Sequence, residues 1–244
     1  QLCGADAYVA MTAGGGCILG MALSNTASEV DLTAAYGQFR DEAAVVAPEY
    51  TPETVNTDGW KATQAAWRTL FPKVVLILCF LHGFLKIRDR CRKAFELHRK
   101  IWEVYQAANA GAFREQMESF RQWCAVRSWS GPIQEALEKL WSRTEEYVRS
   151  YSHPACHRTS NQVDRPMNAL YRLLYAHRTL HGHLETAESR LRGWALLMNF
   201  RPFEPQTRRR TGTQSAAHRL NKTKYHDHWL HNLYISASLG GFRA

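Results

Sequence analysis

Residues 54–79 read TVNTDGWKATQAAWRTLFPKVVLILC, and this stretch indicates the fold class. Residues 54–58 resemble a strand that ends at the Asp58-Gly59 pair. Residues 62–70 place small and apolar side chains on one side of a helix, which a Phe-Pro pair ends. Residues 73–79 are a continuous apolar strand, typical of one buried on both faces of a sheet. The order strand, helix, strand predicts an α/β fold.

The residues before this stretch predict two more strands and a helix. Residues 8–12 and 17–23 are short β-rich runs, and the glycine triplet at 14–16 between them is a hairpin signal. Apolar residues then recur at helical spacing from about Glu29 to Val46. Residues 1–80 therefore read as strand, strand, helix, strand, helix, strand.

The remainder of the chain predicts helices. Apolar residues keep a three-to-four spacing over about six turns from Phe84 to Tyr105, and further helical stripes continue to Tyr147. Two later helices are expected near 161–177 and 184–199, and turns are expected after Pro202. These patterns divide the chain into a discontinuous α/β core (1–84 and 159–200), an all-helical insertion (85–158) and a basic C-terminal tail (201–244).

Charge is distributed unevenly along the 244 residues, whose formal net charge is +9. Residues 1–60 hold one basic and eight acidic residues, whereas residues 201–244 hold eight basic and two acidic ones. Arg208, Arg209 and Arg210 are consecutive in this last segment. An acidic first quarter followed by a basic remainder suggests a polyanion-binding surface, with DNA as the default partner. The alternative is a solvated surface with a basic tail.

Composition excludes several classes. Hydrophobic residues at 45% and charged residues at 22% are typical of a globular chain rather than a disordered one. The longest apolar run, Val74 to Leu81, is far shorter than the roughly 20 residues of a spanning helix, so no membrane partner is expected. The six scattered cysteines form no Cys-x-x-Cys pair and no signal peptide is visible, which indicates reduced thiols in the cytoplasm.

Two aspartates are candidates for chemistry. Asp58 follows a predicted strand and precedes a glycine, at the sheet edge where α/β proteins bind ligands and metals. Asp164 lies in the first turn of the predicted helix after the insertion. Both have structural alternatives: Asp58 as a turn or helix cap, and Asp164 as the acidic residue of a capping box begun by Asn161. Pro166 is awkward for the second alternative, because it removes a helical hydrogen bond.

Cysteine and histidine supply further candidates. Cys79 and His82 have the Cys-x-x-His spacing of zinc ligands, and Cys91, Cys156 and His157 are the residues that could complete such a site. The alternative is a buried thiol with a histidine oriented at the strand-to-helix corner. The histidine groups at 181–183 and 226–228 have metal-binding or surface alternatives in the same way.

Taken together, the motifs resemble a known family. Thr57-Asp58-Gly59-Trp60, Cys79-Phe80-Leu81-His82 and Thr159-Ser160-Asn161-Gln162-Val163-Asp164-Arg165 are similar to motifs of the DDE/D transposases with a ribonuclease-H-like catalytic domain. The closest likeness is to the Mutator-like group, which has a Cys-x-x-His pair after its second catalytic acid. A helical insertion separates the motifs in that family too. The resemblance spans roughly residues 1–200.

The resemblance implies two-metal phosphoryl transfer, in which three carboxylates hold two Mg²⁺ ions. Asp58 matches the second acid and Asp164 the third, while Cys79 and His82 match the pair that supports the site. The first acid has no clear counterpart, because only two strands precede the helix at Glu29 and the family has three. We expect the first strand to lie upstream of Gln1. Asp6 and Asp31 are poorer substitutes.

The sequence therefore predicts a mixed ribonuclease-H-like sheet that lacks its first strand and is interrupted by a helical insertion. The expected function is that of a DNA transposase catalytic region, truncated at its amino terminus and weakly active or inactive as given. Its expected partners are transposon ends and target DNA, in a nucleoid-associated location and with a homo-oligomer left open. The alternatives are a non-catalytic nucleic-acid-binding module on the same fold and another metal-dependent nuclease.

Overall fold

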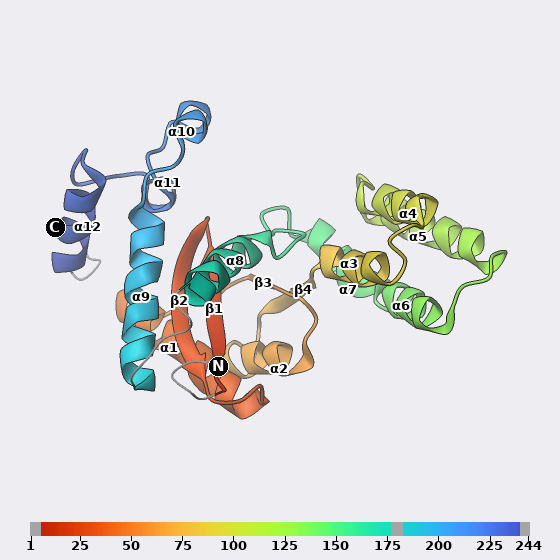
Figure 1. The fold of residues 1–244 in the computed structure, drawn as a ribbon, viewed down its shortest axis with the longest axis horizontal. Coiled ribbons are helices and arrows are strands. Elements are labelled where there is room, and N and C mark those ends of the chain that lie inside the picture. The colour runs from red at the N-terminus through yellow and green to blue at the C-terminus, as the bar shows by residue number, and fades with distance from the viewer. Residues whose placement is uncertain (1–5, 177–182, 240–244) are drawn as a thin grey trace. The chain divides into compact units, whose positions relative to one another are not determined.

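The structure is a computed structural model that describes residues 6–176 and 183–239. Two compact units make up the chain: the first takes residues 1–51, 65–72 and 161–244, and the second takes residues 52–64 and 73–160 (Figure 1). The fold is mixed α/β and 62% helical, with two small sheets of two strands each in the described part of the chain. The α/β class predicted from the sequence is thus confirmed.

The first unit begins with the predicted hairpin. Strands β1 (Tyr8–Gly14) and β2 (Cys17–Ser24) pair antiparallel, with Tyr8 opposite Ser24 and a bulge at Thr12/Ala13. Gly15 and Gly16 form the turn with φ of +59° and +85°, which glycine adopts without steric cost. This pair of left-handed residues explains why the glycine triplet marks a hairpin.

Helices cover both faces of the hairpin. Helix α1 (Glu29–Val46) begins at Ser28, whose side chain accepts a hydrogen bond from the Asp31 N–H, and it packs on the face that presents Ala10 and Ala22. Helices α8 (Asn161–Ala176) and α9 (Leu184–Phe200) pack on the opposite face, against Met11 and Met21 (Figure 1). Alternate residues of the strands therefore enter two different cores, as the strand period of two requires.

The turns expected after Pro202 are wrong, because this segment contains three helices: α10 (Pro205–Thr211), α11 (Ala216–Asn221) and α12 (Trp229–Ser238). Ser215 caps α11 by accepting from the His218 N–H, and Gly212 ends α10 with φ of +66°. Ala217 and Leu233 pack with Phe200 in a small core. The basic residues had obscured these apolar contacts in the sequence.

The second unit contains both strands of the segment quoted first, whereas residues 65–72 belong to the first unit. Strands β3 (Thr54–Thr57) and β4 (Val75–Leu78) pair in parallel, and helix α2 (Lys61–Leu70) connects them along the chain. Leu76, Ile77 and Leu78 are buried, as a strand covered on both faces should be. The predicted order of strand, helix and strand is confirmed, with strand ends one or two residues shorter than expected.

The rest of the second unit is a helical block around one apolar core. The six-turn helix expected from Phe84 to Tyr105 is wrong, because the chain turns at residues 91–94. The Phe84 ring centroid lies 5.9 Å from those of His98 and Trp102, although in one continuous helix Phe84 and His98 would be about 21 Å apart. Folding back lets both halves share the core. The helices are α3 (Phe80–Arg90), α4 (Phe95–Tyr105), α5 (Ala110–Ala125), α6 (Gly131–Trp141), α7 (Thr144–Val148) and the 3₁₀ turn η1 (Arg149–Ser152).

Across residues 6–176 and 183–239, no helix is both long and apolar enough to span a membrane.

Candidate functional site at the carboxyl edge of β3 and β4

Asp58 and Cys79 come directly after two neighbouring parallel strands, so they lie at the same edge of the sheet. The Cys79 N–H donates to the Thr57 carbonyl oxygen at 2.8 Å, which extends the ladder by one residue. Asp58 is exposed, and its Oδ1 accepts from the Trp60 N–H at 2.9 Å. The turn role considered for Asp58 therefore exists. Its second oxygen has no hydrogen-bond partner among the described residues.

Gly59 makes a close approach possible next to Asp58. Its φ is +86°, and a Cβ atom at this position would lie 2.5 Å from Nη1 of Arg143 and 2.7 Å from Cδ1 of Leu78. Both the backbone conformation and the space therefore require glycine. The space that the missing side chain of Gly59 leaves is occupied by the side chain of Arg143.

A buried polar cluster, formed by Cys79, His82 and Ser160, lies at the start of α3. The backbone N–H and the Oγ of Ser160 both donate to Sγ of Cys79 at 3.3 Å, and Oγ lies 3.1 Å from Nδ1 of His82. A hydroxyl has one proton, so when it donates to sulfur it must accept from a protonated Nδ1. The cluster thus orients the imidazole and ties the strand-to-helix corner to a residue 81 positions later.

The thiol of Cys79 differs electrostatically from the other described cysteines. Burial alone raises its pKa, but hydrogen bonds from His82 and Ser160 outweigh burial, and the pKa lies below its usual value. Burial raises the pKa of Cys17 to about 11 and that of Cys124 to about 12, and it raises those of Cys91 and Cys156. The cluster therefore favours a thiolate at Cys79 alone among the described thiols.

The zinc alternative finds no support in the geometry of the cysteines proposed to complete it. Cys91 donates to the Ile87 carbonyl and Cys156 to the Ser150 carbonyl. Within the part of the chain that the structure describes, no three His, Cys, Asp or Glu side chains are grouped so that they could hold a metal ion. The arrangement of Cys79 and His82 matches the other alternative, a buried thiol beside an oriented histidine.

The late histidines divide between described and undescribed parts of the chain. His181 lies outside the described residues. His226 and His228 each have their ring centroid 4.8 Å from that of His231, so three imidazoles meet near the start of α12.

Asp164 lies in the first turn of α8, which begins at Asn161 as predicted and contains Pro166. The start of this helix is anchored to the hairpin, because Oε1 of Gln162 accepts from the Gly16 N–H at 3.2 Å. Asp164 belongs to the first unit and Asp58 to the second. The approach of the two carboxylates therefore stays a prediction.

A Mg²⁺ pair would find one suitable oxygen ligand at this edge. At the carboxyl edge of β3 and β4, Asp58 supplies one carboxylate oxygen without a protein partner, which suits a hard cation. The same edge adds sulfur, imidazole and hydroxyl groups, which are not the oxygen set that Mg²⁺ prefers. Asp58 therefore fits as one ligand, and the second unit does not complete a two-metal site from its described residues.

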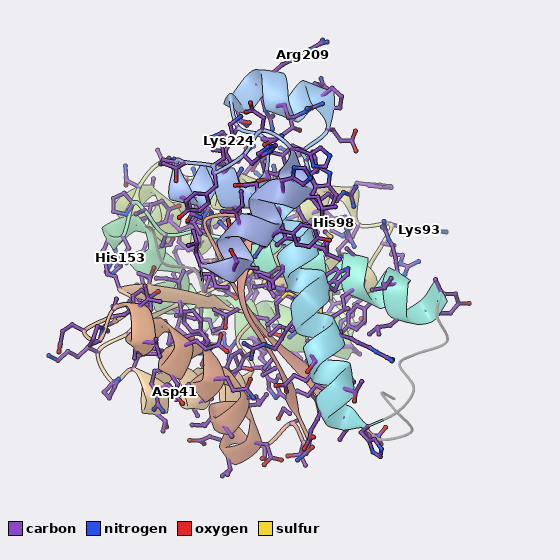
Figure 2. All side chains as sticks on the ribbon, turned by 90° about the vertical axis from the view of Figure 1, so that its left-hand side faces the viewer. Asp41, Lys93, His98, His153, Arg209 and Lys224 are labelled. Carbon is purple, nitrogen blue, oxygen red and sulfur yellow. The ribbon has the colours of Figure 1, made fainter. Side chains whose placement is uncertain are left out.

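The three consecutive arginines are exposed on α10, near its C-terminal end, where cations are favoured by the helix dipole. Side chains of Arg208, Arg209 and Arg210 form no ion pair with any described residue, and Arg209 points away from the ribbon (Figure 2). Because the three arginines are successive in the helix, their charges point in different directions around its axis. They therefore form a broad cationic surface rather than converging on one ligand.

Sequence reasoning missed a second basic surface in the helical block. A cavity of about 340 Å³ is lined by aromatic and cationic side chains, among them Lys93, Trp123 and Trp129. The guanidinium of Arg127 stacks 3.8 Å from the Trp123 ring centroid, and the Phe95 side chain is exposed. Lys93 projects from the ribbon in Figure 2. The alternation of basic and aromatic residues between 92 and 129 was the signal available in the sequence.

No known protein-family model matches the chain, and no curated protein matches it. The likeness to the transposase family therefore enters below only as a proposal.

Proposed function

We propose that the chain is the catalytic region of a DDE/D-type DNA transposase with a ribonuclease-H-like core. One observation carries the proposal: three motifs far apart in the sequence meet in one hydrogen-bonded cluster. The carbonyl of Thr57, the first residue of the first motif, accepts from the Cys79 N–H, and Cys79 accepts from Ser160, which precedes Asn161 and α8. Chance motif matches would have no reason to converge on one sheet edge.

In this proposal a further strand carrying the first acid would complete the ribonuclease-H-like sheet. The weaker candidates for that acid are poorly placed. Asp6 is exposed just before β1, and Asp31 already serves the start of α1, where its Oδ2 accepts from the Thr26 hydroxyl at 2.6 Å. These positions support an acid supplied from another segment.

Mg²⁺ held by Asp58, Asp164 and the first acid would activate water or a DNA 3′-hydroxyl and stabilise the leaving oxygen. The chain's own residues prepare this edge. The Trp60 N–H holds one oxygen of Asp58, and the other has no partner in the described part of the chain. The polar cluster of Cys79, His82 and Ser160 fixes the chain immediately before the helix that bears Asp164. Transposon ends and target DNA are the proposed partners, in a nucleoid-associated location.

A second candidate is a non-catalytic nucleic-acid-binding module on the same fold. The hydrogen bond from the Trp60 N–H to Asp58 favours it, because that bond gives Asp58 a structural role without any metal. A DNA cleavage assay separates this module, which would not cut DNA, from another metal-dependent nuclease of the superfamily, whose substrates would not be transposon ends.

The decisive experiment restores an upstream strand with its acid and compares Mg²⁺-dependent DNA cleavage by the restored chain with that of its Asp58→Asn variant. Asparagine keeps an oxygen for the Trp60 N–H but removes the charge that holds Mg²⁺, so cleavage should be lost with little loss of stability. Asp41→Asn is the matched control, because Asp41 is an exposed carboxylate paired with Arg40. Absence of cleavage by the restored chain itself would favour the non-catalytic module, whereas unchanged cleavage by the Asp58→Asn variant would exclude Asp58 as a metal ligand.

The chain as given should bind DNA in a salt-sensitive way and leave it intact. Each phosphate contact contributes about −0.9 to the slope of log K against log salt concentration. Robust Mg²⁺-dependent cutting by the chain as given would show that the first acid lies within it.

A further inference from the structure

Arg143 stands out because its side chain reaches the candidate site from the helical block. The residue lies in the turn between α6 and α7, where its carbonyl oxygen accepts from the N–H groups of Glu146 and Tyr147. Its Nη1 lies where a side chain at Gly59, the residue after Asp58, would begin. A residue of the insertion thus brings a positive charge to the glycine that follows a candidate ligand of the core.

Among the described residues, the charge of Arg143 has no carboxylate partner within hydrogen-bond distance. Its side chain is only 20% exposed, and the one carboxylate near it among the described residues is Glu146, whose Oε1 lies 3.8 Å from Nε. That separation is too long for a hydrogen bond. The Nη groups form no hydrogen bond with any described residue. A mostly covered guanidinium cannot lose its proton, so its unused donors favour an anionic ligand.

Asp58 does not neutralise the Arg143 guanidinium in place of such a ligand. No ion pair joins Asp58 to Arg143 among the described residues, although Gly59 separates Asp58 from the guanidinium by a single position. The Arg143 guanidinium, which approaches Gly59, and the Asp58 carboxylate therefore do not neutralise each other, and each can contact a ligand. Arginine presents paired N–H donors that match the oxygens of a phosphate group.

We propose that Arg143 binds the non-bridging oxygens of a DNA phosphodiester at the carboxyl edge of β3 and β4. The inference rests on the proposed function and adds a substrate-binding residue that the family motifs do not contain. It also gives the helical insertion a direct part in substrate binding, because Arg143 comes from the turn between two of its helices.

The test measures DNA binding of the chain as given to a duplex oligonucleotide in EDTA, over a range of NaCl concentrations. Arg143→Gln should weaken binding about tenfold, the loss expected for a charged hydrogen-bonded contact, and should reduce the salt slope by about 0.9. Arg143→Lys keeps the charge and should keep the slope while losing part of the affinity. Arg114→Gln is the matched control, because Arg114 lies in the same unit and both its Nε and Nη2 bond Glu145 at 2.7 Å.

Two further variants make the result specific to this edge. Glu146→Gln removes the carboxylate nearest to Arg143 and should strengthen binding, whereas Asp58→Asn removes a negative charge beside the phosphate and should strengthen binding in EDTA. These gains cannot come from misfolding, so they remain informative if Arg143→Gln folds poorly. Equal affinity and slope for the Arg143→Gln and Arg114→Gln variants, or no gain from either carboxylate change, would overturn the inference.

The failure of this inference is distinguishable from failure of the proposed function. If wild-type chain binds DNA with a salt slope that Arg143→Gln does not change, the inference alone is wrong. If wild-type chain shows no salt-dependent DNA binding, both are wrong. If binding follows the expected pattern while the restored chain never cleaves DNA, Arg143 is a DNA contact of the non-catalytic module.

Discussion

Ser160→Ala removes a hydroxyl that serves two partners at once, the buried Cys79 and the half-buried His82. Its Oγ lies 3.3 Å from Sγ of Cys79 and 3.1 Å from Nδ1 of His82. Each neutral hydrogen bond contributes about 1 kcal/mol, so losing both should lower the free energy of unfolding by about 2 kcal/mol. The backbone N–H of Ser160 still donates to the sulfur, which keeps the loss below that of removing Cys79 itself.

Urea unfolding measures this change, and amide hydrogen exchange of residues 75–82 locates it in the second unit. Ser142→Ala is the control, because Ser142 is exposed and its hydroxyl only donates to the Lys139 carbonyl. That variant should stay within about 0.5 kcal/mol of the parent. If Ser160→Ala were as mild as the control, the polar cluster would not hold the segment before α8, and the observation behind the proposed function would lose its force.

Three other changes test separate features. Gly59→Ala should destabilise by at least about 1–2 kcal/mol because its φ is +86°, whereas Gly193→Ala, in the interior of α9 with open space around it, should stabilise by up to about 1 kcal/mol; urea unfolding should give opposite signs. Cys79 should ionise at a lower pH than an ordinary thiol, because hydrogen bonds lower its pKa, and Cys79→Ser should abolish its thiolate absorbance. Because the pKa of Cys79 is lower in the folded state, the stabilisation from its thiolate should be complete above the pKa of the unfolded state. It should decline as the pH falls through the pKa of the folded state. A difference in the free energy of unfolding between the parent and Cys79→Ser that does not change with pH would contradict this. Asn199→Ala removes bonds to both the N–H and the carbonyl of Ile18, each 2.8 Å long, and should cost about 2 kcal/mol in urea unfolding; a loss under 0.5 kcal/mol would contradict this.

Local patterns were sufficient to predict the elements around the site. The apolar residues of β4 and of the helix before it can be buried well in only one arrangement. The Asp58-Gly59 pair marks the end of β3 whatever element follows. Helix α8 begins at Asn161 for an equally local reason, since the residues before it favour a helix start. Such features depend on neighbours in the sequence, so the sequence determines them.

Features that depend on distant neighbours were not predictable. Nothing local distinguishes the break at 91–94 from a continued helix, because the apolar spacing persists across it and only the shared core makes the turn favourable. Arg143 is one of many basic residues of the insertion, and its closeness to Gly59 follows from the packing of α6 and α7 in the second unit. Periodicity identifies the buried face of a helix but does not identify its partner.

The structural and catalytic interpretations of Asp58 are compatible, and this decides how the proposal should be tested. One oxygen of the carboxylate is used by the turn, and the other has no protein partner among the described residues. A change to alanine would remove both roles and could not separate them. Asparagine preserves the acceptor of the turn and removes only the charge. Loss of Mg²⁺-dependent cleavage in a stable Asp58→Asn variant would therefore report on metal binding, whereas full activity would leave the turn as the whole role of Asp58.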